Sequence, residues 1–165
     1  MKLLLRFFVN QDLSGYLQGL SKELDENSNS VRLELNRLEK AGMLCSEQEG
    51  RRKLYRVNKK HPLTSDLTTM LRKVTGIDTI LERVISKVQD QLKEVWICGK
   101  LAQGLDSETI DVLLIGEGLD QDYISGLVQK TEEIIDKKIL CNIKETLSES
   151  ERSQCLLIWQ KTEEQ

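Results

Sequence analysis

The densest group of residues able to do chemistry is a run of cations in the first half of the chain. Positions 51 to 60 hold six Lys or Arg residues and no Asp or Glu. The cations are Arg51, Arg52, Lys53, Arg56, Lys59 and Lys60. Closely spaced cations neutralise the phosphates of a nucleic acid and release its counterions. We expect the first three, which follow Gly50, to hold a phosphate backbone.

Amide and guanidinium side chains gather in the segment just before these cations. The residues concerned are Asn29, Ser30, Arg32, Asn36 and Arg37. Asn can pair bidentately with adenine and Arg with guanine, while Ser reaches phosphates. An ordinary solvated helix face has a similar composition, so the residues alone leave both interpretations open.

Helices must position these side chains. Leu3–Val9 is a short apolar helix candidate. Leucines at 13, 17, 20 and 24 predict a second helix, and Ser14 can cap its start. Asn27 or Ser28 can cap a third helix, with Val31, Leu35 and Leu38 as its buried stripe and Gly42 at its end.

A basic-tipped hairpin is expected next. Residues 43–47 and 53–57 read as strands, joined by a turn over 48–52 that is centred on Gly50. Three helices, the last with a polar face, followed by such a hairpin are the order of a winged helix-turn-helix.

Two stretches make this resemblance specific. SVRLELNRLEKAGML at 30–44 and EGRRKLYRVNKKHPL at 49–63 resemble the winged-helix domains of ArsR/MarR-type bacterial transcription regulators. The resemblance implies a DNA-binding domain over residues 1–61 that takes double-stranded DNA. A winged helix that serves protein contacts is the alternative.

Residues 62–92 are expected to form connecting helices after Pro62. Two apolar stripes run through them, one from Leu63 to Val74 and one from Ile77 to Leu92, with Gly76 between. They predict either a homodimer seam or packing within the second module.

Residues 93–165 are expected to form a small α/β layer. Strand candidates are 95–98, 110–115 and 138–144, an amphipathic helix is expected at 120–137, and a final helix at 148–161. The fold class is therefore α+β: a winged helix-turn-helix followed by a small α/β domain with a short mixed sheet.

The stretch VWICGKLAQGLDSETIDVLLIG at 95–116 resembles the minimal nucleotidyltransferase domain. In that family a strand ends in Gly-Ser and an Asp-x-Asp pair opens the next strand. Gly99, Ala102, Gly104 and Asp111 match in position, but Lys100 replaces the serine and Thr109 replaces the first aspartate. Two carboxylates at i and i+2 share a strand face and can hold two metal ions, whereas Thr109 and Asp111 offer one.

These departures predict a catalytically inactive domain with no catalytic residues, metal or cofactor. Gly99, Lys100, Thr109 and Asp111 would form a degenerate nucleotide pocket. Lys100 could pair with Asp111 in place of the lost cation, attract a small anionic effector, or do neither.

Composition limits the alternatives. The 165 residues are 39% hydrophobic and 31% charged, and no apolar run is long enough to span a bilayer. Residues 1–65 carry 12 Lys and Arg against 8 Asp and Glu, while residues 66–165 carry 12 against 19. The four cysteines have no C-x-x-C spacing, which favours buried free thiols and a reducing cytoplasm.

The sequence therefore predicts a cytoplasmic, homodimeric, sequence-specific transcription regulator that is not an enzyme. Its second domain would serve effector sensing or assembly, with no membrane contact. An active nucleotidyltransferase, and an antitoxin-like module that binds a partner protein, are the alternatives.

Overall fold

The computed structural model describes residues 1–162, which have an α+β fold with two separate sheets. The chain divides into two compact units, Met1–Leu71 and Arg72–Gln165. The boundary falls inside helix α4 (Thr64–Thr75). None of the described helices is long and apolar enough to span a membrane.

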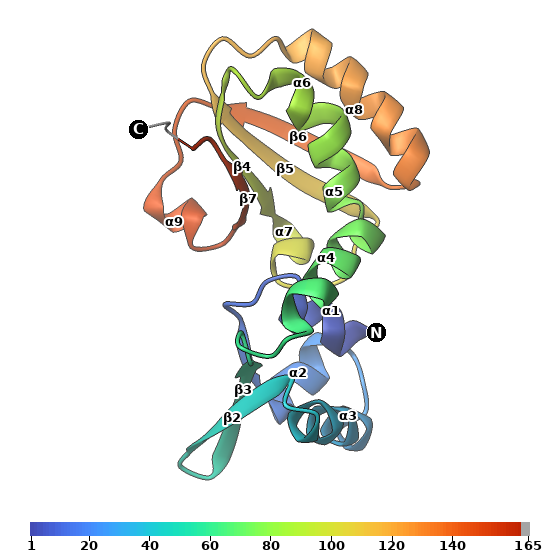
Figure 1. The fold of residues 1–165 in the computed structure, drawn as a ribbon, viewed down its shortest axis with the longest axis vertical. Coiled ribbons are helices and arrows are strands. Elements are labelled where there is room, and N and C mark those ends of the chain that lie inside the picture. The colour runs from blue at the N-terminus through green and yellow to red at the C-terminus, as the bar shows by residue number, and fades with distance from the viewer. Residues whose placement is uncertain (163–165) are drawn as a thin grey trace. The chain divides into compact units, whose positions relative to one another are not determined.

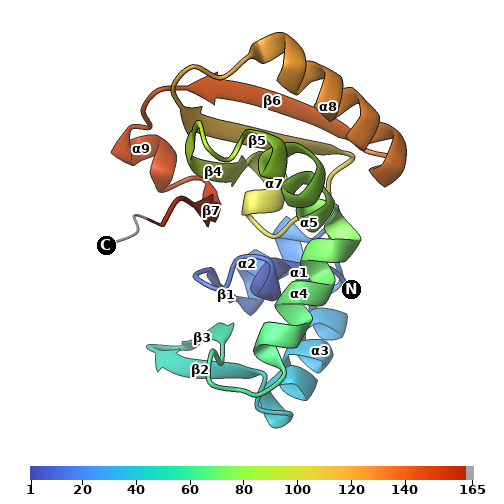
Figure 2. The same cartoon turned by 45° about the horizontal axis from the view of Figure 1, so that its top comes forward.

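The first unit consists of three helices and a three-stranded antiparallel sheet of order β1-β3-β2. Its elements are α1 (Lys2–Phe8), β1 (Ser14–Tyr16), α2 (Leu17–Glu23), α3 (Ser28–Lys40), β2 (Leu44–Glu49) and β3 (Arg52–Val57), followed by α4. Phe7, Phe8, Leu20 and Leu35 are fully buried in its core. Figures 1 and 2 both show α3 and the β2–β3 hairpin side by side at one end of this unit.

The predicted caps of α3 are confirmed. The Asn27 side chain accepts a hydrogen bond of 2.8 Å from the backbone N–H of Asn29 and so caps the start of the helix. At the other end Gly42 has φ +76°, and the N–H groups of Gly42 and Met43 donate to the carbonyls of Glu39 and Leu38. This Schellman arrangement turns the chain directly into β2.

The predicted helix that starts near Ser14 is wrong in its first turn. Ser14–Tyr16 instead forms β1, which pairs antiparallel with Leu54–Arg56 of β3, and α2 begins only at Leu17. Pairing with a strand distant in sequence outweighs the local leucine spacing. Gly15 allows β1 to lie close to Leu20 of α2, because a Cβ at position 15 would lie 2.8 Å from the buried Leu20 side chain.

The second unit is a four-stranded mixed sheet, order β6-β5-β4-β7, with helices on it. Its elements are α5 (Ile77–Ile80), the π-helical turn η1 (Leu81–Ile85), α6 (Ser86–Val88), β4 (Leu92–Cys98), α7 (Gly99–Ala102), β5 (Thr109–Gly116), α8 (Gln121–Ile135), β6 (Lys138–Lys144), α9 (Glu149–Arg152) and β7 (Leu156–Gln160). Strands β5 and β6 are parallel, and α8, which connects them, packs against β6, α5 and η1 (Figure 1).

Two predicted helices of this unit are wrong in part. The stripe from Ile77 to Leu92 is divided into α5, η1 and α6, and Leu92 already belongs to β4, where it pairs with Gly116. The expected helix at 148–161 is a single turn, α9, followed by strand β7, which pairs with β4. Short apolar runs suit either structure, and here the open edge of β4 selects the strand.

The prediction of buried free thiols is wrong for Cys98 and Cys155. Cys98 and Cys155 form a disulfide with a Cα–Cα distance of 4.4 Å, and Cys45 is exposed. Cys141 is free and partly buried, and burial raises the pKa of its thiol to about 11. The disulfide joins the end of β4 to the residue before β7, and a chain with this bond does not indicate a reducing compartment.

Candidate nucleic-acid interface

The outer face of α3 carries the four residues predicted to meet base edges, together with Ser30, which was predicted to reach phosphates. Val31 and Leu35 are buried, whereas Asn29, Ser30, Arg32, Asn36 and Arg37 are all exposed. With 13 residues the helix is about 20 Å long. A helix of this size, with its polar side facing away from the core, can enter a major groove.

These five side chains differ in what they already bind. Arg32 donates a hydrogen bond to Oδ1 of Asn29, so the two act as one unit on the helix surface. Within residues 1–162 the side chains of Ser30, Asn36 and Arg37 make no hydrogen bond or ion pair, which leaves their donors and acceptors available.

One exposed residue on this face was not predicted as a site residue. The side chain of Leu33 lies among the polar ones and is 59% exposed. An apolar group on a DNA-facing helix can contact a thymine methyl. The signal in the sequence is a leucine that falls outside the stripe of Val31, Leu35 and Leu38.

The hairpin presents its cations from a tight turn. Glu49 pairs with Arg52, so Gly50 and Arg51 alone form the loop. Gly50 has φ +60°, which a type II′ turn requires at this position. Arg51 is exposed, and its side chain has no hydrogen-bond or ion-pair partner in the part of the chain that the structure describes.

The other two cations predicted to contact phosphates, Arg52 and Lys53, already interact with side chains of the protein. The Arg52 guanidinium lies 5.2 Å from the ring centroid of Tyr16, a residue of β1 whose hydroxyl donates to Glu49. That hydrogen bond raises the pKa of Tyr16. The stacking leaves Arg52 exposed but fixes its direction.

Lys53 connects the hairpin to α3. Its ammonium lies 2.7 Å from Oε2 of Glu39 and 5.3 Å from the ring centroid of Tyr55. The Lys53 ammonium and then the Ser46 hydroxyl, which also donates to Glu39, hold the pKa of that carboxyl below its usual value. Glu39 was not predicted as a site residue, because only the tertiary structure brings it to the hairpin.

In the second unit, the four residues of the predicted nucleotide pocket are only partly brought together. Gly99 has φ +65° at the start of α7, and a Cβ there would overlap Oδ2 of Asp111 on β5. Lys100 and Thr109 line a cavity of about 460 Å³ that is bordered by Asp106 and Lys137, which pair at 3.2 Å. Neither Lys100 nor Asp111 forms an ion pair within residues 1–162, so the structure does not show the pairing of the two that the sequence suggested as one alternative.

The donors present do not fit a pair of divalent cations. Asp111 is the one acidic residue of β5, and it lies on the same face of the strand as Thr109, which supplies a hydroxyl. No cluster of three or more His, Cys, Asp or Glu residues suited to a metal ion occurs in the described chain. One carboxylate and one hydroxyl do not supply the ligands that two-metal nucleotidyl transfer needs.

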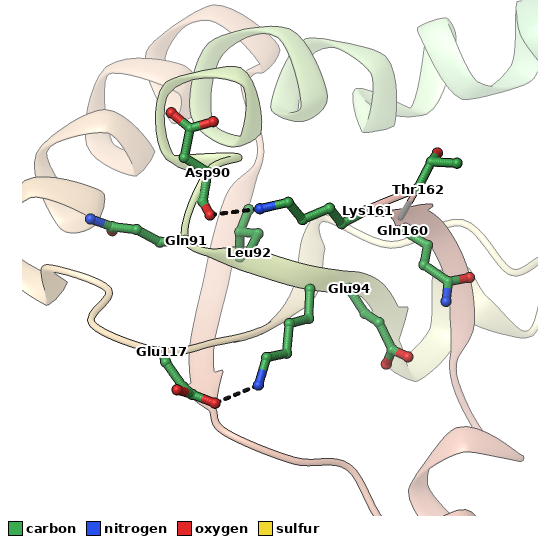
Figure 3. Close-up of a pocket in the computed structure, with 9 residues that line it drawn as sticks. Asp90, Gln91, Leu92, Glu94, Glu117, Gln160, Lys161 and Thr162 are labelled. Carbon is green, nitrogen blue, oxygen red and sulfur yellow. Dashed lines mark hydrogen bonds and ion pairs between the residues drawn. The ribbon is translucent and has the colours of Figure 1, made fainter. Parts of the chain in front are cut away.

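A larger cavity of about 950 Å³ lies elsewhere in the second unit, at the start of β4 and the end of β7 (Figure 3). Its charged groups are largely satisfied internally, since Lys93 pairs with Glu117 and the Lys161 ammonium donates to the Asp90 carbonyl at 3.0 Å. None of the predicted pocket residues lines it.

Comparison with known proteins adds one match. A family model described as PaaX-like protein, a family of helix-turn-helix transcription regulators, matches residues 13–61. The match spans β1, α2, α3 and the hairpin, so it covers every residue of the interface described above. No curated protein and no solved structure matches the chain.

Proposed function

We propose that this protein is a DNA-binding transcription regulator whose first unit is a winged helix-turn-helix. In this proposal α3 enters the major groove and the β2–β3 hairpin, as the wing, follows the neighbouring phosphates. The observation that carries the proposal is that Asn36, Arg37 and Arg51, on α3 and the adjacent hairpin loop, are exposed and unpaired within residues 1–162. The PaaX-like match over the same segment supports it.

The three hairpin cations have different roles in this proposal. Arg51 and Arg52 contact phosphates, because both are exposed and neither forms an ion pair with an acid in the described chain. Lys53 positions the hairpin through Glu39. Arg37 and Asn36 discriminate bases, because they lie on the helix and not on the hairpin.

Titration of the full chain against duplex DNA from upstream of its own gene, at several salt concentrations and with random competitor, tests the proposal. We expect saturable binding that survives competitor. Each lost phosphate contact lowers the salt slope by about 0.9, so Arg51→Ala with Arg52→Ala should reduce it by about two for every duplex. Absence of binding at low salt contradicts the proposal and leaves the interaction-module alternative.

Two exposed cations of the second unit provide the matched control. Arg83→Ala with Lys87→Ala removes the same charge from η1 and α6, which are elements of the second unit and contribute no residue to the interface described above. This variant should keep the salt slope of the natural protein, in contrast to Arg51→Ala with Arg52→Ala. An equal loss in both double variants would mean that total charge, and not the hairpin, governs binding.

For the second unit we propose a nucleotidyltransferase-like domain that does not catalyse transfer and instead serves effector sensing or assembly. The single carboxylate of Asp111 beside Thr109 supports this. Incubation with Mg²⁺ and labelled nucleoside triphosphates should leave protein and nucleic acid unlabelled. Metal-dependent labelling that Asp111→Ala removes would show the active-enzyme alternative to be correct.

A further inference from the structure

Helix α4 carries an apolar stripe that nothing in the described chain covers. Leu63, Met70 and Val74 are 49%, 61% and 67% exposed, and Leu67 between them is half-buried. The N–H of Leu67 donates to the Leu63 carbonyl at 2.9 Å, so the helical spacing extends back to Leu63. Four large apolar side chains therefore form one continuous row along about 18 Å of helix.

A different face of the same helix packs against the protein. Thr64 donates to the Asn58 carbonyl and Thr68 donates to the Phe8 carbonyl, both at 2.9 Å. Leu71 and Thr75 continue this face and are 5% and 3% exposed. The exposed row lies about 100° around the helix from this face, so internal packing does not account for it.

The spacing of the row is that of a helix-pairing seam. Successive members are separated by four, three and four residues, which is the alternation of a and d positions in a heptad repeat. On α8 the comparable exposed positions, Tyr123 and Ile134, have Lys130 between them, which interrupts the row.

Charge indicates which partner fits. Asp66 and Lys73 flank the row on its polar side, seven residues apart, and neither side chain has a hydrogen bond or ion pair within residues 1–162. By contrast, Arg72 is paired with Asp78 at 3.2 Å. A second α4 that runs antiparallel would place the partner's Lys73 opposite Asp66 and the partner's Asp66 opposite Lys73.

We propose that the occupant of this row is α4 of a second copy of the chain, packed antiparallel about a two-fold axis. In this arrangement Leu67 meets the partner's Met70 and Leu63 meets the partner's Val74, so the row is complementary to itself. A parallel pair would place Asp66 against the partner's Leu71 and leave the Asp66 carboxylate without a cation. The proposal concerns self-association and holds whether or not the protein binds DNA.

Sedimentation velocity of the full chain from 1 to 100 μM tests it. The natural chain should form dimers reversibly in this range, and Met70→Glu should weaken the dimer about a hundredfold by placing two charges in the seam. Because Met70 is mostly exposed, the protomer should keep its circular dichroism and melting temperature. Tyr123→Glu, which adds the same charge at an exposed site on α8, should leave the dimer unchanged.

Charge exchange tests the orientation. Asp66→Lys and Lys73→Asp should each weaken the dimer about tenfold, because each creates two like-charge pairs. The double variant should regain the affinity of the natural chain. Each change also opposes the dipole of its own helix, so an effect confined to the protomer would add in the double variant and could not produce rescue.

A chain that stays monomeric at 100 μM, or a dimer that Met70→Glu does not weaken, overturns the proposal. A dimer that Met70→Glu weakens but that charge exchange does not rescue overturns the antiparallel pairing.

Discussion

The ammonium of Lys53 on β3 lies 2.7 Å from the carboxylate of Glu39 on α3, and this pair joins the hairpin to the helix beside it. Glu39 also accepts a hydrogen bond from Ser46 on β2. One carboxylate thus holds both strands of the hairpin against the helix. If α3 reads bases and the hairpin holds phosphates, this contact sets the spacing between the two.

Replacement of Lys53 should therefore differ from replacement of Arg51. We expect Lys53→Ala to lower the free energy of unfolding by up to about 1 kcal/mol, because it removes a half-exposed ion pair. Arg51→Ala should change it by less than about 0.5 kcal/mol, since no contact is lost. Urea unfolding of both variants checks this, and equal stability losses would refute the distinction.

The same pair predicts a dependence of stability on pH. The folded-state pKa of Glu39 lies below its usual value of 4.5, chiefly because Lys53 bonds its ionised form. Its contribution is therefore fully present above about pH 4.5 and is lost as the pH falls through the lower, folded-state value. Urea midpoints between pH 3 and 7 should fall less steeply on acidification in Glu39→Gln than in the natural protein. Parallel profiles would show that Glu39 does not contribute.

Arg6 on α1 is a second ion pair to test, because it is buried. Its Nε donates to Glu23 at 2.8 Å, its Nη2 donates to the Ser14 carbonyl at 3.3 Å, and Nη1 has no hydrogen-bond partner among residues 1–162. We expect Glu23→Ala to cost about 2 kcal/mol, because it leaves a buried cation without its counter-ion. Arg6→Met, which removes the charge and keeps the apolar stem, should cost less. A larger loss in Arg6→Met would contradict this order.

The disulfide should contribute strongly to the second unit. Cys98 and Cys155 are 57 residues apart in sequence. In the loop-entropy description, a cross-link that closes a loop of this length lowers the entropy of the unfolded chain and stabilises the folded state by about 4 kcal/mol. Cys98→Ser with Cys155→Ser should lower the unfolding free energy by about 2 to 4 kcal/mol relative to the oxidised protein. A double variant as stable as the oxidised protein would show that the bond does not form in solution.

Thiol counting checks the cysteine assignments independently. Cys45 is exposed and should react rapidly with a chromogenic disulfide reagent at pH 8 under non-reducing conditions. Cys141 should react slowly, because burial raises its pKa to about 11 and keeps the thiol protonated. Cys45→Ser should remove the rapid phase, and two rapid thiols in the natural protein would contradict the assignment.

Local signals were sufficient for α3 and the hairpin. The stripe of Val31 and Leu35, the cap at Asn27, the stop at Gly42 and the turn at Gly50 are all set by neighbours in sequence. Each of these features acts within a few residues, so the sequence alone places α3 and the turn at Gly50. The strands extend to Glu49 and Arg52, however, and leave a shorter loop than the predicted turn over 48–52. The run of cations from Arg51 is likewise visible without a structure.

Long-range pairing decided the rest. Ser14–Tyr16 and Leu156–Gln160 became strands because β3 and β4 offered them open edges, and the apolar composition of such short segments does not distinguish a strand from a helix. The Cys98–Cys155 bond depends on the same event, since β7 brings Cys155 to the end of β4. The tertiary structure also separated the cations: Lys53 is bound to Glu39 across 14 residues of sequence, while Arg51 in the turn is free within the described chain. Composition fixes the number of charges, but only packing determines which of them remain available.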